Sequence, residues 1–162
     1  MAVENKWVDA NVAAGKKGQP SKIMPGQIFG MACTFEVAAA NDDGSIFKLA
    51  LIGGNMVPLS LSMNSDAIAG ATSYDLGFYT EAGVDAGKAV FMSAHDINGG
   101  FARGSELNLL HDLAIEKIGQ NVYEILGKTL TTKENAYVLA LTANTVGTAA
   151  GTISVYGTFI QG

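Results

Sequence analysis

Apolar and polar residues alternate with a period of two over most of the chain after residue 30. The pattern is clearest in residues 59–64, which read Leu-Ser-Leu-Ser-Met-Asn. The other runs of this kind span residues 31–37, 47–51, 74–79, 89–93, 137–142 and 153–159. Because successive side chains of a strand point to opposite faces, these runs predict six to eight short β-strands, each with one buried face.

Turn residues separate the predicted strands. Asn41-Asp42-Asp43-Gly44 lies between two of the runs, and a glycine-flanked link from Gly147 to Gly151 lies between the last two. Asx side chains bond the local backbone and glycine tolerates a positive φ, so both sequences are typical of tight turns. We therefore predict two hairpins, each formed by the pair of runs that flank one of these turns.

One segment has a helical pattern. Ser105 is a potential N-cap, Glu106 and Lys117 have the charges that suit the first and last turns, and Gly119 follows the end. The apolar stripe consists of Leu107, Leu110, Ala114 and Ile118. The pattern predicts a helix over residues 105–118, and a short apolar turn follows over residues 122–126.

One helix among many short strands indicates an all-β domain. We expect a β-sandwich or a small barrel, of jelly-roll or β-tulip type, with one short α-helix. Residues 31–162 form this body. Residues 1–30 show no period and contain Pro20, Pro25 and several glycines, so we expect an extended N-terminal arm.

The arm is apolar and basic, unlike a typical disordered tail. It carries the chain's one tryptophan, Trp7, which would be exposed unless it docks on the body or on a neighbour. The candidate contact residues of the arm are Trp7, Val8, Lys16, Lys17, Lys22 and Ile23. An aromatic anchor with flanking lysines suits an acidic protein surface.

Charge is sparse and unevenly distributed. Charged residues make up 15% of the chain, where about 25% is usual, so we expect copies of the chain or a partner to cover much of its surface. The net charge is −5; residues 1–24 carry +2, which leaves −7 on the remainder. An acidic body repels phosphate, which argues against a nucleic-acid partner.

Neither a membrane nor a secretory route is indicated. The sequence has no stretch approaching the roughly 20 apolar residues of a spanning helix, so we expect no membrane partner. The first residues have no apolar segment of the secretory type. We expect synthesis in the cytoplasm and, if the protein leaves the cell, release by lysis.

Catalytic and metal-binding patterns are weak. His95-Asp96 and His111-Asp112 would need further ligands to hold a metal, and Asp42–Ser45 has no EF-hand glutamate after it. Cys33, the single cysteine, lies in a strand-like apolar run and is expected to be a buried, unreactive thiol. We therefore expect no enzyme activity, no catalytic residues, no metal and no cofactor.

Several runs together carry a resemblance to a known family. These runs are Asp66–Gly70, Tyr74–Tyr79, Val122–Gly127, Tyr137–Thr142 and Ala149–Ile153. With them, and over roughly residues 30–160, the chain resembles tailed-bacteriophage head proteins of similar length, described as capsid decoration or cement proteins. The arm looks like that family's variable N-terminal extension.

The resemblance implies a structural role. Such proteins bind the exterior of an expanded capsid at local symmetry axes and clamp neighbouring major capsid subunits. It implies the major capsid protein as partner, a homo-oligomer (a trimer is favoured over a dimer), synthesis in the host cytoplasm and a final location on the outside of the virion.

Two other functions remain open. One is a carbohydrate-binding β-sandwich displayed on a virion, for which Tyr79 and Tyr156 are candidate exposed aromatic residues, while Tyr74 is expected to face the core. The other is a tail-tube or connector component, which would assemble into rings. Glycan binding by the isolated protein would favour the first, and a hexameric ring the second.

Overall fold

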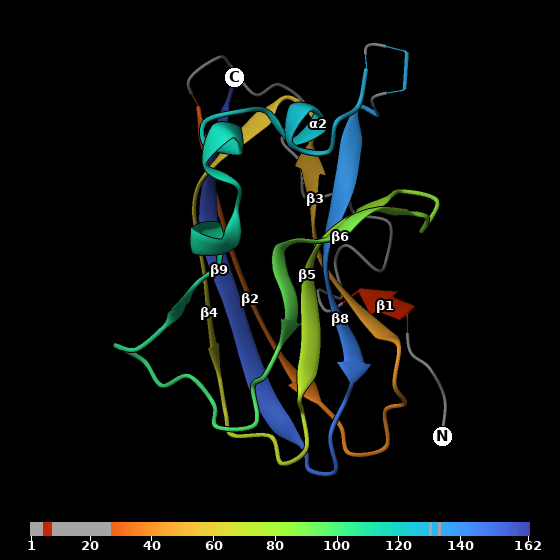
Figure 1. Ribbon diagram of the computed structural model, residues 1–162, viewed down its shortest axis with the longest axis vertical. Helices are drawn as coiled ribbons and strands as arrows, with labels where there is room; N and C mark the ends of the chain where they lie inside the picture. Colours follow the sequence, from red (N-terminus) through yellow and green to blue (C-terminus); the bar gives the residue numbers. More distant parts are fainter. Residues whose placement is uncertain (1–4, 8–26, 130, 133) are drawn as a thin grey trace.

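The computed structural model describes residues 5–7, 27–129, 131–132 and 134–162 as a sandwich of two open β-sheets (Figure 1). The five-stranded sheet has the order β1-β3-β8-β5-β6, and the four-stranded sheet has the order β2-β9-β4-β7. The strands are β1 (Asn5–Trp7), β2 (Ile28–Val37), β3 (Ser45–Gly53), β4 (Met56–Ser65), β5 (Ser73–Thr80), β6 (Asp85–His95), β7 (Leu107–Asn108), β8 (Ala136–Thr145) and β9 (Gly151–Gln161). The prediction of an all-β sandwich is confirmed.

Consecutive strands mostly cross between the sheets. β2 pairs with β9 and β3 pairs with β8, so both predicted hairpins are wrong. The flanking strands instead face each other across the core: the rings of Phe35 and Phe47 stack with centroids 5.1 Å apart, and the Cys33 thiol donates to the Leu49 carbonyl oxygen at 3.3 Å. The Asn41–Gly44 turn therefore connects the two layers of the sandwich.

The core lies between the sheets and is aromatic. Tyr74 is fully buried, as predicted, and its hydroxyl donates to the Val146 carbonyl oxygen at 2.9 Å, which ties β5 to the loop after β8. Five other large rings are buried without measurable exposure: Phe47, Phe78, Phe91, Tyr137 and Phe159. Each of these five rings comes from a different strand, so the packing of the core depends on strands from both sheets.

The predicted helix over residues 105–118 is wrong. This segment forms β7 and two 3-10 helices, η1 (Leu109–Asp112) and η2 (Ile115–Lys117), and the helical path is interrupted at Ala114, whose ψ of 133° is extended. Leu109 and Leu113 are buried, and η1 packs against both β4 and β6. The segment thus closes one open side of the sandwich. The predicted turn after it is confirmed as α2 (Val122–Ile125).

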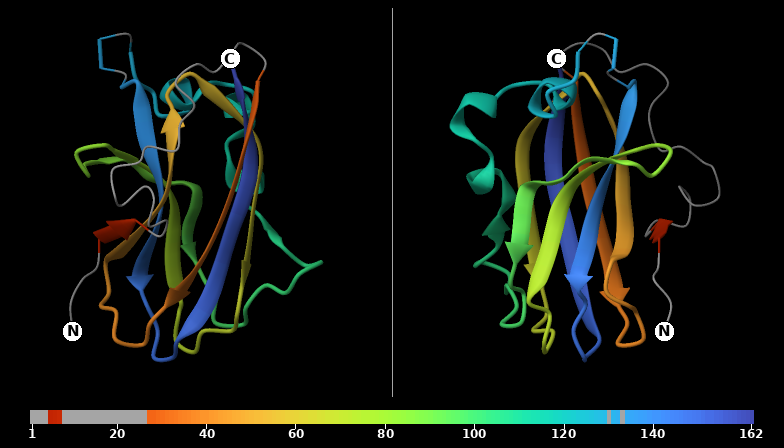
Figure 2. Two further views of the ribbon diagram at one scale, coloured as in Figure 1. Left: turned by 180° about the vertical axis from the view of Figure 1, so that it is seen from behind. Right: turned by 45° about the vertical axis from the view of Figure 1, so that its right-hand side comes forward.

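The β5–β6 hairpin leans across the outer face of the five-stranded sheet (Figure 2). At Gly77 the β6 backbone approaches so closely that a Cβ atom there would overlap the Gly87 carbonyl oxygen and lie 2.6 Å from the Lys88 carbonyl carbon. The Lys88 ammonium lies 3.6 Å from the buried Asp75 carboxylate. Gly77 is therefore required for the hairpin to fold back over the sheet.

Candidate functional site

The start of the arm lies against the body. β1 pairs in parallel with the edge of β3, with Trp7 opposite Lys48 (Figure 1). The other candidate contact residues of the arm lie outside the described residues: Val8, Lys16, Lys17, Lys22 and Ile23. The proposed contact between the arm and a neighbour therefore remains a prediction.

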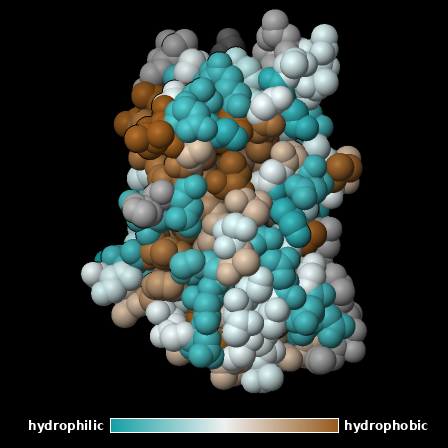
Figure 3. Space-filling model, viewed as in Figure 1, coloured by the Kyte–Doolittle hydropathy of each residue, from teal (hydrophilic) through white to brown (hydrophobic). Residues whose placement is uncertain are grey.

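Two isoleucines form the most exposed apolar feature of the described surface. Ile115 in η2 is 84% exposed, and Ile118, which follows η2, is 63% exposed. Figure 3 shows apolar residues gathered over this end of the molecule. The sequence pattern placed Ile118 on a buried helical stripe, but η2 has no buried residue. Paired exposed isoleucines of this kind are typical of a protein–protein contact.

The outer face of the four-stranded sheet is nearly uncharged, and Glu36 is the one charged residue in the strands of this sheet. Hydroxyl groups pair across neighbouring strands: Thr34 with Ser154 at 2.8 Å, and Ser60 with Thr158 at 2.7 Å. One end of the sheet is apolar, because Ile28 is 62% exposed and Leu59 is 49% exposed. Coulombic attraction therefore contributes little to what this face binds.

Tyr156 is the exposed aromatic residue of this face. It lies in β9 opposite Ala32 and Ser62, and 36% of it is exposed. The expectation that Tyr79 is also exposed is wrong, because Tyr79 is only 5% exposed and its hydroxyl bonds with the Thr142 hydroxyl at 2.7 Å. Tyr79 lies in a second apolar cluster on the face that the β5–β6 hairpin crosses.

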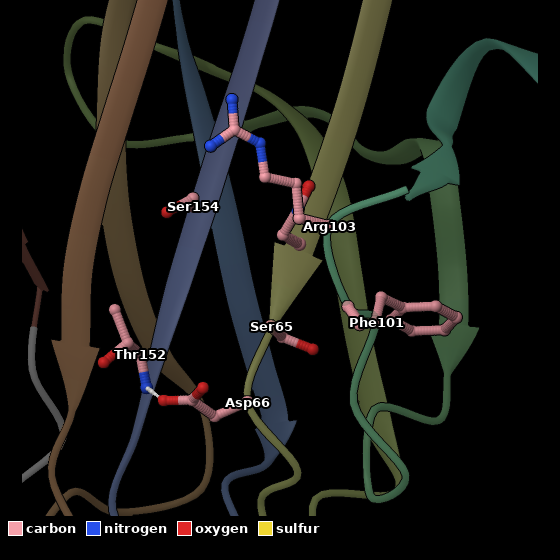
Figure 4. Close-up of a pocket in the computed structure, with 8 residues that line it drawn as sticks. Ser65, Asp66, Phe101, Arg103, Thr152 and Ser154 are labelled. Atoms are coloured by element: carbon pink, nitrogen blue, oxygen red, sulfur yellow. Dashed lines mark hydrogen bonds between the residues drawn. The ribbon is translucent and has the colours of Figure 1, made fainter. Parts of the chain in front are cut away.

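A shallow pocket of about 180 Å³ opens beside this face (Figure 4). Three segments build it: the end of β4, the loop before β7 and the start of β9. Ser65 and Phe101 join the first two by reciprocal backbone hydrogen bonds of 3.1 and 2.8 Å, and the Asp66 carboxylate accepts from the Thr152 backbone at 2.9 Å. The lining residues are Asn64, Ser65, Asp66, Phe101, Ala102, Arg103, Thr152 and Ser154.

Glu106 connects the pocket to Tyr156. Its carboxylate accepts from the Gly104 backbone at 2.8 Å and from the side chains of Asn64 and Tyr156. These hydrogen bonds, the Gly104 one foremost, lower the pKa of Glu106. Loss of solvation and then the Glu106 charge raise the pKa of Tyr156. At neutral pH the pair is therefore an ionised carboxylate beside a protonated phenol.

Two buried oxygens in the pocket wall lack a hydrogen-bond partner. They are the Asn64 Oδ1 and Ser65 Oγ atoms. Ser65 is only 8% exposed. The two atoms lie on opposite faces of β4, because Asn64 is opposite Ser154 of β9 and Ser65 is opposite the core residue Ile153.

The described part of the chain offers no arrangement typical of catalysis or metal binding. Within it, no three His, Cys, Asp or Glu side chains come together as a metal would require. The His95 ring instead packs against Phe101, with centroids 5.5 Å apart. No helix among the described residues is both long and apolar enough to span a membrane.

The fold resembles chains from two solved phage capsid structures. A chain from the capsid of Ralstonia phage GP4 is 17% identical with a TM-score of 0.61, and the match covers 97% of this chain and 99% of that one. A chain from the cyanophage Pam1 capsid asymmetric unit is 12% identical with a TM-score of 0.53, covering 90% and 92%. No protein family and no curated protein matches the sequence. At these identities the likeness establishes the fold.

Proposed function

We propose that this chain is a virion structural protein without catalytic activity. In this role it binds the exterior of a tailed-phage capsid and cements neighbouring major capsid subunits, acting as a homo-oligomer, a trimer in preference to a dimer. The observation that carries the proposal is the end-to-end fold likeness to chains from two phage capsid structures. This likeness covers 97% of this chain and 99% of the Ralstonia phage GP4 chain, so it is not confined to one part of the sandwich.

The surface supports a role in assembly. In an isolated monomer the exposed side chains of Ile115 and Ile118 keep apolar area in contact with water. Burying this area against another subunit would be favourable. The arm begins with β1 on the opposite side of the sandwich from the 101–104 loop, as Figures 1 and 2 show. β1, which is the described part of the arm, therefore lies away from this loop.

Oligomerisation would strengthen weak individual contacts. A single extended arm buries limited area, and one such contact is of modest affinity. Several arms presented at one symmetry axis bind together with a high effective concentration, which raises the overall affinity without new contacts. This explains how a sparsely charged protein could hold a pressurised shell.

Co-sedimentation tests the proposal. Purified chain is mixed with capsids of the encoding phage that lack it, and the pellet is assayed for bound protein. We expect saturable binding at a fixed ratio to the major capsid protein, together with a raised temperature of capsid disruption. Failure to bind, or binding without any gain in capsid stability, would contradict the cementing role.

A further inference from the structure

Each of the two sheets has two outer edges, and the β2 edge is both long and regular. β1 has three residues and β7 has two, so neither offers much backbone to a neighbouring strand. β6 is long, but its register with β5 shifts in three places and its Ala94 has a positive φ of 48°. β2 has ten residues in unbroken register with β9 and, among the described strands, pairs with no other. β2 is therefore the edge at which a further strand could extend a sheet.

Alternate residues of β2 direct their backbone groups to this open side. The Gln161 N–H donates to the Gln27 carbonyl oxygen at 3.1 Å, and this pair continues the register of β2 with β9. Every second pair of an antiparallel ladder exchanges hydrogen bonds, so the odd-numbered residues of β2 bond to β9. The even-numbered residues point their N–H and C=O groups away from β9, and these are Ile28, Gly30, Ala32, Thr34 and Glu36.

The β2 edge lacks the features by which proteins protect exposed strands. Such edges usually carry a lysine, a proline or a bulge. Residues 28–37 contain no lysine and no proline, and their register with β9 has no bulge. The even-numbered residues are all exposed, and Gly30, Ala32 and Thr34 among them are small. Another strand can therefore approach this edge closely.

We propose that this edge binds the β2 edge of a second copy of the chain, antiparallel and around a two-fold axis at Ala32. Ala32 then lies opposite its counterpart, Gly30 opposite Thr34 of the second copy, and Ile28 opposite Glu36. This register pairs all the edge-directed residues and forms about ten backbone hydrogen bonds, whereas a slip by two residues leaves one of them unpaired. The edge is thus complementary to itself, as a two-fold contact requires.

Charge favours a second copy in this orientation. Each copy has a net charge of −5, so two copies approach best through a surface with few charges, and Glu36 is the one charged residue of β2. In the antiparallel register the two Glu36 carboxylates are eight residues apart along the seam, about 27 Å, which is well beyond the screening length of about 8 Å. A parallel pairing would place them side by side, where like charges destabilise a sheet.

The inner side of the seam adds apolar contact. Phe29, Cys33 and Phe35 are partly buried against the core of their own chain. In the proposed register Phe29 lies opposite Phe35 of the second copy, and Cys33 lies opposite Met31. The second copy would therefore cover apolar area that these side chains leave exposed in a monomer, and this burial adds to the backbone hydrogen bonds.

This inference does not rest on the capsid proposal. A two-fold contact cannot close a trimer, so it joins two chains whether or not each of them also belongs to a trimer held by another surface. A chain that does not bind capsids could still pair through β2, and a cementing trimer could leave β2 unpaired. The failure of one proposal is therefore distinguishable from the failure of the other.

Cysteine cross-linking of the full chain tests the contact. Cys33→Ala removes the single cysteine, and Ala32→Cys in this background places two thiols across the axis with Cα atoms about 5.5 Å apart, within reach of a disulfide. Under mild oxidation we expect a covalent dimer from purified chain. Val84→Cys in the same background is the control, because Val84 is 62% exposed and lies outside β2, and it should stay monomeric. Equal cross-linking in both variants, cross-linking in neither, or cross-linking of Ala32→Cys only to a capsid subunit added to the reaction would overturn the proposal.

Charged variants separate pairing from folding. Ala32 is exposed, so Ala32→Lys and Ala32→Glu should each keep the Tm of the parent chain. Each variant places like charges opposite each other and should raise the dissociation constant of the dimer at least about five-fold in sedimentation experiments. An equimolar mixture of the two should restore the dimer, because a lysine then lies opposite a glutamate. Thr152→Lys, at an exposed residue outside β2, should leave the dissociation constant unchanged. A parent chain that stays monomeric up to about 1 mM, or a mixture that associates no more tightly than the separate variants, would overturn the assignment.

Discussion

Gly77→Ala should destabilise the protein strongly, although it adds only one methyl group. The new Cβ would overlap the Gly87 carbonyl oxygen and lie 2.6 and 2.8 Å from the carbonyl carbon and oxygen of Lys88. These are backbone atoms, so the overlap can be relieved only if the backbone of the β5–β6 hairpin moves. Overpacking of a well-packed site costs about 1–3 kcal/mol, and this contact belongs at the upper end.

A cost of about 3 kcal/mol corresponds to a fall in Tm of about 6–12 °C for a domain of this size. Gly30→Ala is the matched control, because Gly30 also lies in a strand and nothing lies within 4 Å of its Cβ position. Alanine there restricts the unfolded chain and should raise stability by about 0.4–1 kcal/mol. The two variants have the same chemical change and opposite expected signs.

Urea unfolding followed by circular dichroism measures both changes. We expect the free energies of unfolding of the two variants to differ by about 3–4 kcal/mol, with similar m-values. If Gly77→Ala were as stable as Gly30→Ala, the close approach of β6 to Gly77 would be refuted.

Three further outcomes follow from the structure. Burial, and then the Asp43 charge, raise the pKa of Tyr74, so its contribution to stability is full below about pH 10 and is lost as pH rises further. Tyr74→Phe should cost about 1 kcal/mol at pH 7 and flatten the decline of Tm above about pH 10; parallel curves would contradict this. Deletion of residues 1–24 removes only the three-residue β1 pairing from the described sheets, so the body should stay folded but no longer co-sediment with capsids; undiminished binding would disprove the arm contact. Ile115→Ser with Ile118→Ser should leave stability within about 0.5 kcal/mol and weaken capsid binding, unlike the exposed control Val84→Ser; equal binding by both would remove the isoleucines from the interface.

The strands were predictable because period-two alternation reports directly which face of a strand is buried. Residues 59–64 lie within β4, and residues 74–79 lie within β5. Alternation does not report which strand lies next to which. The Asn41–Gly44 turn therefore looked like a hairpin turn, although the same residues carry the chain from one sheet to the other.

The helix prediction failed because the apolar residues after residue 105 do not all fall on one face of a helix. The stripe through Leu107 and Leu110 suggested a helix, but Leu109 and Leu113 are the buried residues. η1 packs against both β4 and β6, whereas η2 has no buried residue, so only the first part of the segment belongs to the core. Tertiary packing overrode the local pattern.

The pocket could not be predicted from sequence at all. Its walls come from residues near 65, 102 and 153, and only the strand order brings them together. Tyr156 was identifiable as a candidate exposed aromatic residue, but Tyr79 had the same alternating context. Tyr79 is buried because it packs in a cluster with Val138 and Ala140 of the neighbouring strand, and such a contact between strands leaves no periodic signal.

The central claim is that this chain is an external component of a phage capsid. Cryo-electron microscopy of particles with and without the chain tests it most directly. We predict difference density on the outer surface at local symmetry axes, into which the two-sheet sandwich fits with β1 toward the shell. Identical particles in the two reconstructions, or density confined to the interior or the tail, would contradict the account.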